Sequence, residues 1–519
     1  MLTREKSYPE SGPVLAELAH HWSEAASIGH EATAVTWCRR AAQHAMQSLS
    51  FDDAAGHLRR ALEIGGGVID ERTRAEVLVE LAEALGDGGQ PISSLEAAAQ
   101  AGELAQSHGW NEVLSRAALS FGGHAAIWAL NRDRRGRALA RAALEQSVPG
   151  TISHTRLLAK LASLSVFSLP ATERLIMAAQ VLAGVEGLGD RALIQRIVSE
   201  LTWAFDPNLR GPKWEHALEL LAGVTDTRDA RGLFIVSRCR GQAAIMVGDG
   251  QGFRAAVEAS LPLRDQLSDA DRSHLAAQRG HVAIWDGDFL AAERYYEEAF
   301  QLGRGELRDT ATGNRVFALV LLGWLRGDLS PARLAAADLH AGLGGPNTEA
   351  VYMWVELACG KREPALKFLA SFGERHRRVF LTSAICGQGL AASTLASVAL
   401  GDREIMRKVD GIFEELGFEI FTGSPPPALA VAYYRGILAH GLGDLERAAA
   451  LLEHSLAVHR RLPAIPYIAA SQAALAEVFA EQRQHAEAGR LAAAALETAE
   501  RIAAWGVARQ ARLALERLP

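Results

Sequence analysis

This sequence of 519 residues has few aromatic residues and few cysteines, and the small number of cysteines excludes several kinds of site. Aromatic residues make up 6% of the chain. The four cysteines, at positions 38, 239, 359 and 386, form no C-x-x-C pair. A zinc ribbon, a thioredoxin-like motif and a disulfide scaffold are therefore not indicated. This cysteine usage predicts a reducing, cytoplasmic location.

The sequence also lacks a strong charge imbalance and long apolar runs. Lys plus Arg number 54 and Asp plus Glu number 61, so the net charge is only -7. This argues against a chain-wide electrostatic attraction to nucleic acid. The longest apolar stretch, Val316 to Leu325, falls far short of the ~20 residues of a membrane span. We expect no membrane insertion and no direct nucleic-acid binding.

Apolar residues, by contrast, are abundant and follow a helical rhythm. They make up 49% of the chain, and with so few aromatics alanine and leucine must supply much of this content. The clearest unit is GHVAIWDGDFLAAERYYEEAFQLG, residues 280–303. Gly280 and Ala283 precede a turn at 286–288. A second helix follows, whose apolar residues at spacings of three and four share one face: Phe289, Ala292, Tyr296 and Ala299.

The same arrangement recurs along the chain. Its copies are Ala42, Ala45, Phe51, Ala54, Leu58, Ala61 and Leu62; Gly360, Ala365 and Leu369; Gly436, Ala439, Leu445, Ala448, Leu452 and Leu456; and Ala476, Phe479, His485, Ala488, Ala492, Ala495 and Leu496. These units resemble the tetratricopeptide family. The resemblance implies an all-α superhelical solenoid of stacked helix pairs. We predict a flexible segment over residues 1–12 and a tetratricopeptide-like α-solenoid over residues 13–519.

The N-terminal region carries a second resemblance. The stretch from Glu17 to Ile64 contains LAHHW, an alanine-rich helix and FDDAA. It resembles the start of the helical-repeat region of large ATP-binding transcriptional regulators of the LuxR type. The sequence has no G-x-x-x-x-G-K-[ST] motif and no helix-turn-helix module after Pro519, so ATPase and DNA-binding activities are not carried over. The resemblance implies a sensor or protein-interaction region.

Signatures of catalysis and of metal binding are missing. No G-x-S-x-G is present. His20 and His21 are adjacent on a predicted helix and point about 100° apart. His274 and His281 are seven residues apart, whereas zinc motifs use spacings of three or four. Cys38 lies in a predicted helix and is interpreted as a small buried hydrophobe. We predict no catalytic residue, no metal and no cofactor.

Aromatic residues in two loops are candidates for ligand or partner binding. Trp203 and Trp214 flank an irregular segment, and together with Phe205 they could line an apolar pocket on the concave face. Phe418 and Phe421 precede three prolines in a loop that could face a partner. The alternative for both groups is ordinary packing inside the array.

Two short basic clusters are the other candidates. One contains Arg134 and Arg135, and the other contains Arg377 and Arg378. The arginine fork suits a phosphate or an acidic peptide. The alternative is a solvated surface, because an acidic residue lies in or beside each cluster.

These observations favour a non-catalytic binding or scaffold protein. Its concave groove would recognise a protein partner or a small-molecule signal, as the sensor or interaction region of a signalling or transcriptional regulator. An enzyme or a small-molecule-binding protein whose site is assembled from distant repeats is one alternative. A split partner of an ATP-binding regulator is another.

Overall fold

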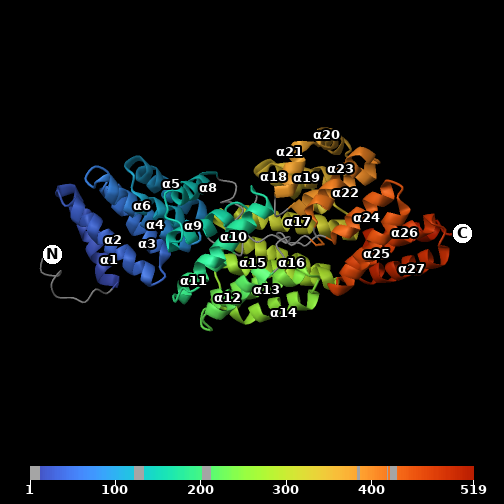
Figure 1. Cartoon of the computed structure of the whole chain (residues 1–519), viewed down its shortest axis with the longest axis horizontal. Coiled ribbons are helices and arrows are strands. Elements are labelled where there is room, and N and C mark those ends of the chain that lie inside the picture. Colours follow the sequence, from blue (N-terminus) through green and yellow to red (C-terminus); the bar gives the residue numbers. More distant parts are fainter. Residues whose placement is uncertain are drawn as a thin grey trace. The chain divides into compact units, whose positions relative to one another are not determined.

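The computed structural model describes residues 12–121, 134–166, 168–201, 212–382, 386–417, 419–420 and 429–519, and all regular elements in these ranges are helices (Figure 1). The chain forms two compact units. Unit 1 comprises Met1–Ser165, Met177–Gly187 and Gly305–Leu307. Unit 2 comprises Val166–Ile176, Leu188–Arg304 and Arg308–Pro519. Each unit is a stack of helix pairs, as the sequence predicted. The single array over residues 13–519 stays a prediction.

Unit 1 is built from consecutive antiparallel helices that pack on their sequence neighbours. Its elements are α1 (Gly12–Ala25), η1 (Ala26–Ile28), α2 (Glu31–Gln47), α3 (Phe51–Ile64), α4 (Glu71–Asp87), α5 (Pro91–His108), α6 (Asn111–Ser120), α8 (Arg134–Glu145), α9 (Ile152–Ser163), part of α10 (Ala171–Val185) and η4 (Gly305–Leu307). Their apolar faces form one continuous core.

Unit 2 repeats the same scheme over more helices. Its elements are the start of α10, then α11 (Arg191–Leu201), α12 (Pro212–Val224), α13 (Ala230–Met246), α14 (Gly250–Ser260), η3 (Leu261–Gln266), α15 (Asp269–Asp286), α16 (Phe289–Leu302), α17 (Arg308–Arg326), η5 (Ser330–Ala332), α18 (Arg333–Leu343), α19 (Pro346–Ala358), α20 (Glu363–Ser371), α21 (Glu374–Thr382), α22 (Cys386–Leu400), α23 (Arg403–Leu416), α24 (Val431–Gly441), α25 (Leu445–Arg461), α26 (Ile465–Glu481), α27 (His485–Arg501) and α28 (Trp505–Glu516). In the described ranges, no helix is both long and apolar enough to span a bilayer.

The predicted repeat unit at 280–303 is confirmed, and the role of its small residue is visible. A Cβ atom placed on Gly280 of α15 would lie 2.7 Å from the ring of Tyr296 on α16. Gly436 of α24 stands in the same relation to Leu452 of α25, again at 2.7 Å. The missing side chain therefore lets the large residue of the second helix lie against the backbone of the first.

The turn predicted at 286–288 is confirmed as well. Gly287 adopts φ +77°, in the left-handed region that favours glycine. The next residue, Asp288, starts α16 and its carboxylate accepts a hydrogen bond from the Ala291 N–H at 2.9 Å. Gly443 and Asp444 repeat this pair before α25. A Gly-Asp dipeptide thus ends one helix and starts the next.

The stack of unit 2 curves until its late helices meet its earlier ones. Helix α28 packs against α17, and α26 packs against α15. Two glycines allow backbones to touch here. A Cβ on Gly250 would lie 2.3 Å from the Leu462 carbonyl oxygen, and one on Gly506 would lie 2.3 Å from the Trp324 carbonyl oxygen. Unit 2 is therefore a solenoid that closes on itself.

Two glycine-to-alanine changes in unit 2 should have opposite effects on the free energy of unfolding, because only Gly506 lies at this closure. Gly506→Ala should lower the free energy of unfolding by about 1–3 kcal/mol, because its methyl group meets backbone atoms. Gly411→Ala in α23 should raise it by about 0.5–1 kcal/mol, because nothing lies within 4 Å of that Cβ position and alanine favours a helix. Urea unfolding followed by circular dichroism checks both. Equal midpoints for Gly506→Ala and the wild type would show that α28 does not meet α17.

Candidate functional site

A concave site lies in unit 1, where the first helices of successive pairs form one wall. Helix α2 supplies half of the lining residues, α4 and the loop before it supply most of the others, and α6 contributes Arg116. The space within the site, open solvent included, amounts to about 1520 Å³. We call it the unit 1 groove, and its lining comprises Ala32, Val35, Thr36, Arg39, Arg40, Ala42, Gln43, Met46, Leu58, Val68, Ile69, Asp70, Thr73, Glu80, Glu83 and Arg116.

A two-pronged ion pair joins the neighbouring first helices across the groove. The Arg39 guanidinium of α2 donates from Nε to one Glu80 oxygen at 3.1 Å and from Nη2 to the other. Glu76 lies one helical turn away, at 3.6 Å from the same guanidinium. The bond to Glu80 is the main cause that raises the pKa of Arg39 above its ordinary value, so the charge is fixed. This pair holds α2 against α4.

Two further arginines of the groove have no carboxylate partner among the described residues. Arg40 is exposed, and its guanidinium lies over the ring of Trp37, 4.8 Å from the ring centre. Arg116 on α6 is exposed and makes no ion pair with any described residue. Of the acidic residues in the lining, Glu80 holds Arg39, while Asp70 accepts the Thr73 N–H and keeps its negative charge. Three arginines and three acidic residues, Asp70, Glu80 and Glu83, line the groove, so the positive charge that it offers is local to Arg40 and Arg116.

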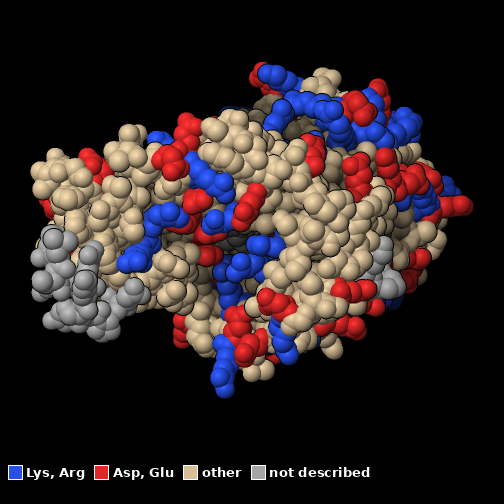
Figure 2. Space-filling view, turned by 60° about the vertical axis from the view of Figure 1, so that its left-hand side comes forward, with Lys and Arg blue, Asp and Glu red and all other residues tan. Residues whose placement is uncertain are grey.

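The basic residues singled out from the sequence lie elsewhere. Arg134 and Arg135 begin α8 and are exposed. Arg377 on α21 forms ion pairs with Glu374 and Glu415, whereas Arg378 is exposed. Neither cluster lines the unit 1 groove. On the face shown in Figure 2, basic and acidic side chains are interspersed, and much of the surface is uncharged.

The predicted aromatic sites are only partly covered by the structure. Trp214 lies in α12 and is 4% exposed, so its side chain belongs to the interior of unit 2. Its expected neighbours Trp203 and Phe205 lie outside the described residues, and so do Phe418 and Phe421. These pockets stay predictions.

Sequence reasoning did not find the groove residues. Arg39 and Glu80 are 41 positions apart, and no local motif links them. The usable signal is the phase of the repeat, because the polar positions of successive first helices face the same side once each helix pair is located. Reading that signal requires knowing which polar face turns inward, and the sequence does not state it.

A serine–histidine arrangement in unit 2 bears on the enzyme alternative. His459 of α25 lies 2.9 Å from the Ser471 hydroxyl through Nδ1, and its Nε2 accepts the Ala430 N–H at 2.9 Å. Ser455 lies 2.8 Å from Ser471. All three side chains have no exposed surface. Since no substrate can reach them, this network ties α24, α25 and α26 together rather than serving as a nucleophile and base.

Metal binding and reactive thiols find no support in the described part of the chain. No group of three or more histidine, cysteine or acidic side chains is arranged to hold a metal ion among the residues that the structure describes. Cys38 is fully buried, as predicted, and burial raises the pKa of its thiol. A raised pKa keeps the thiol protonated and unreactive.

Comparisons with known proteins identify no family for this chain. No protein-family model matches the sequence, and no curated protein matches it. Solved structures match the chain, and two of them align along most of its length. The crystal structure of the APC/C hetero-tetramer Cut9–Hcn1 aligns with a TM-score of 0.44 and 11% identity, over 97% of this chain and 96% of that chain. The crystal structure of yeast Tom70 aligns with a TM-score of 0.32 and 12% identity, over 89% and 99%. At such scores the helix-pair description rests on this chain's own packing.

Two buried histidines of unit 2 should respond differently to substitution at pH 7. His281 has no hydrogen-bond partner for either ring nitrogen among the described residues, so His281→Leu removes unsatisfied buried atoms and should not lower the free energy of unfolding. His459→Leu should lower it by about 1–3 kcal/mol, because the buried Ala430 N–H loses its acceptor. Urea unfolding at pH 7 measures both, and a large loss for His281→Leu would contradict this assignment.

The His281→Leu substitution should also change how the free energy of unfolding responds to acid. Burial, and to a smaller extent the nearby His274, lowers the pKa of His281 to about 3, while 6.5 is its ordinary value. Between a pH of about 3 and 6.5, His281 is therefore protonated in the unfolded chain and neutral in the folded chain. Stability is complete above pH 6.5 and falls as the pH drops toward 3. At pH 5, His281→Leu should retain on the order of 2 kcal/mol more of its neutral-pH stability than the wild type does. Equal losses for both proteins would refute this.

Proposed function

We propose that this protein binds a segment of a partner protein in the unit 1 groove, and that it acts as a scaffold rather than as an enzyme. The observation that carries the proposal is the wall formed by the first helices α2, α4 and α6. Such a wall is an extended surface to which several repeats contribute at once. The groove combines charged and apolar side chains on a surface that is open to solvent, so a segment of another protein can reach it.

Charge indicates the chemistry of the segment. Arg40 and Arg116 lack carboxylate partners among the described residues, while Arg39 is already bound by Glu80. An acidic stretch of the partner would supply those carboxylates. The apolar residues Val35 and Met46 lie on the same wall and would contact its apolar side chains. The ligand is thus an acidic segment that also carries apolar residues.

The test compares two variants of exposed arginines. The tagged protein is expressed in its own cells, purified gently and studied by native mass spectrometry together with quantitative proteomics. Arg40→Glu combined with Arg116→Glu should reduce recovery of the bound partner by at least about tenfold, since both changes turn attraction into repulsion. Arg59→Glu on α3 is the matched control, because Arg59 is exposed but does not line the groove. It should leave recovery unchanged.

Two results would overturn the proposal. One is a wild-type protein that retains no partner above the background of a tag-only purification. The other is a partner recovered equally with the double variant and with the wild type. Circular dichroism of the double variant should match that of the wild type, because both substituted side chains are exposed.

A role as the interaction region of a signalling or transcriptional regulator is the finer form of this proposal. It is supported by the resemblance of Glu17 to Ile64 to the repeat region of LuxR-type regulators. The four free cysteines, three of them buried, are consistent with the proposed cytoplasmic location. The identity of the recovered partner decides the matter, since a nucleotide-binding or DNA-binding chain would support the regulator and a metabolic enzyme would not.

A further inference from the structure

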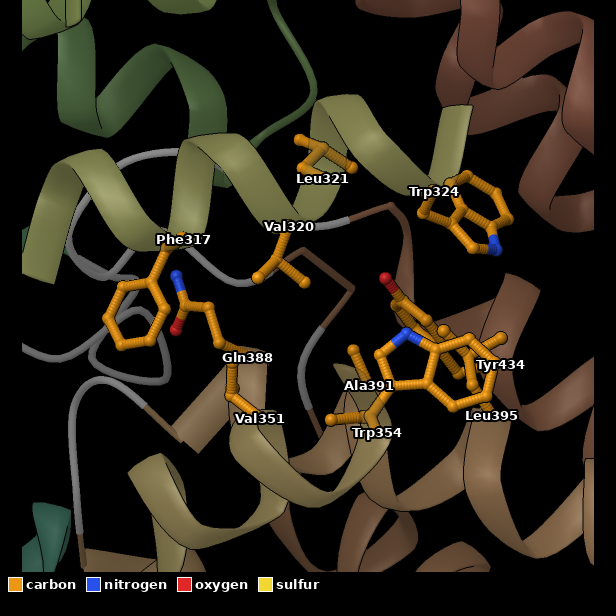
Figure 3. A pocket seen from close by; sticks show the side chains of 11 residues that line it. Phe317, Val320, Leu321, Trp324, Val351, Trp354, Gln388, Ala391, Leu395 and Tyr434 are labelled. Carbon is orange, nitrogen blue, oxygen red and sulfur yellow. The ribbon is translucent and has the colours of Figure 1, made fainter. Parts of the chain in front are cut away.

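Unit 2 contains a second concave site whose chemistry differs from that of the groove. It lies among the first helices of four successive pairs, α17, α19, α22 and α24 (Figure 3). The space among its side chains amounts to about 530 Å³, open solvent at its mouth included. We call it the apolar pocket, and its lining comprises Phe317, Val320, Leu321, Trp324, Val351, Trp354, Gln388, Ala391, Ala392, Leu395 and Tyr434.

No lining side chain of this pocket carries a charge. The polar groups are few and mostly engaged. Gln388 has an interaction partner, and the Tyr434 hydroxyl meets the backbone of Leu429. Transfer of an ion into such surroundings would be costly, because nothing would replace its hydration. The occupant must therefore be uncharged and largely apolar.

One polar atom of the lining lacks a partner. The indole Nε1 of Trp354 is buried and finds no hydrogen-bond acceptor among the described residues. In Figure 3 this nitrogen is turned toward the middle of the pocket. A buried N–H without an acceptor costs about 1–3 kcal/mol, so an occupant with a suitably placed acceptor is favoured over one without. This atom gives the occupant one polar requirement.

The pocket is bounded at one end by aromatic rings. Trp324 lines it, and the ring of Trp324 lies 6.1 Å from the ring of Tyr433 on α24. Part of the space inside the pocket is open to solvent, so a ligand larger than the enclosed part would lie partly in its mouth.

We propose that the apolar pocket binds an uncharged small molecule with a flat apolar body and one carbonyl or ether oxygen, which accepts a hydrogen bond from Trp354 Nε1. The aromatic rings of Phe317, Trp324 and Trp354 provide faces for the flat body. This site is separate from the unit 1 groove in ligand class and in residues.

The probe for the test is the neutral dye 6-propionyl-2-dimethylaminonaphthalene, which has a flat ring system and one ketone. Titration into the wild-type protein should give saturable binding with a shift of the emission to shorter wavelengths. Trp354→Phe should weaken that binding by roughly three- to tenfold, which corresponds to one lost hydrogen bond. Ala391→Trp should abolish it, because Ala391 faces the pocket and a larger side chain would fill the space.

Two controls separate the hydrogen bond from general effects. Trp505→Phe changes a tryptophan of α28 that is 49% exposed and does not line the pocket, so it should bind the dye as the wild type does. The analogue with a propyl group in place of the propionyl group lacks the acceptor. Its affinity should differ much less between the wild type and Trp354→Phe than the affinity of the dye itself does.

The inference fails if the wild type shows no saturable binding, or if Trp354→Phe and Ala391→Trp both bind the dye as the wild type does. It also fails if Trp354→Phe weakens the dye and its propyl analogue equally, because the indole would then act by shape alone. Should Ala391→Trp not fold, Ala391→Leu replaces it. None of these outcomes affects the proposal for the unit 1 groove, which rests on Arg40 and Arg116 in the other unit.

Discussion

Close approach of paired helices is the constraint on which this structure depends. The side chain of Tyr296 occupies space that any residue larger than glycine would take at position 280, and Leu452 does the same opposite Gly436. Each pair therefore packs through a small residue on one helix and a large one on the other. Pairs of this kind cannot bury their apolar faces alone, so they must stack. The stacking aligns the first helices, and the concave surfaces follow from that alignment.

Each of the two concave sites is lined by first helices of its own unit, and the chemistry of the two linings is opposite. In unit 1 the wall carries arginines and glutamates, with the Arg39–Glu80 pair holding neighbouring repeats together. In unit 2 it carries tryptophans, a phenylalanine and aliphatic residues. Some lining residues also belong to the core, such as Val35 in unit 1 and Phe317 in unit 2, whereas Arg40 and Arg116 are exposed. Only the exposed members can change without disturbing the core, so packing and ligand preference share part of their positions.

The sequence was sufficient for the local rules of the fold and insufficient for its sites. The spacing of Phe289, Ala292 and Tyr296 located a helix face, and all three are buried. The Gly-Asp turn and the burial of Cys38 were also predictable, because each depends on a few neighbouring residues. The apolar pocket draws on helices from Phe317 to Tyr434, and its existence depends on how four repeats curve together. Curvature is the sum of many small packing angles, so it cannot be predicted from any single residue. The clusters at Arg134 and Arg377 were chosen for local charge density, which does not indicate where a groove lies.

The closure of unit 2 sets it apart from open repeat arrays. In an open array, stability is close to a sum over neighbouring repeats, and a repeat can be added or removed at modest cost. Here Gly506 meets the backbone at Trp324 and Gly250 meets the backbone at Leu462. Residues far apart in sequence must therefore lie at the same level of the stack. An inserted helix pair would move both contacts out of register at once. The number of repeats between α14 and α28 is thus fixed by geometry, and change in this unit has to come through side chains instead of length.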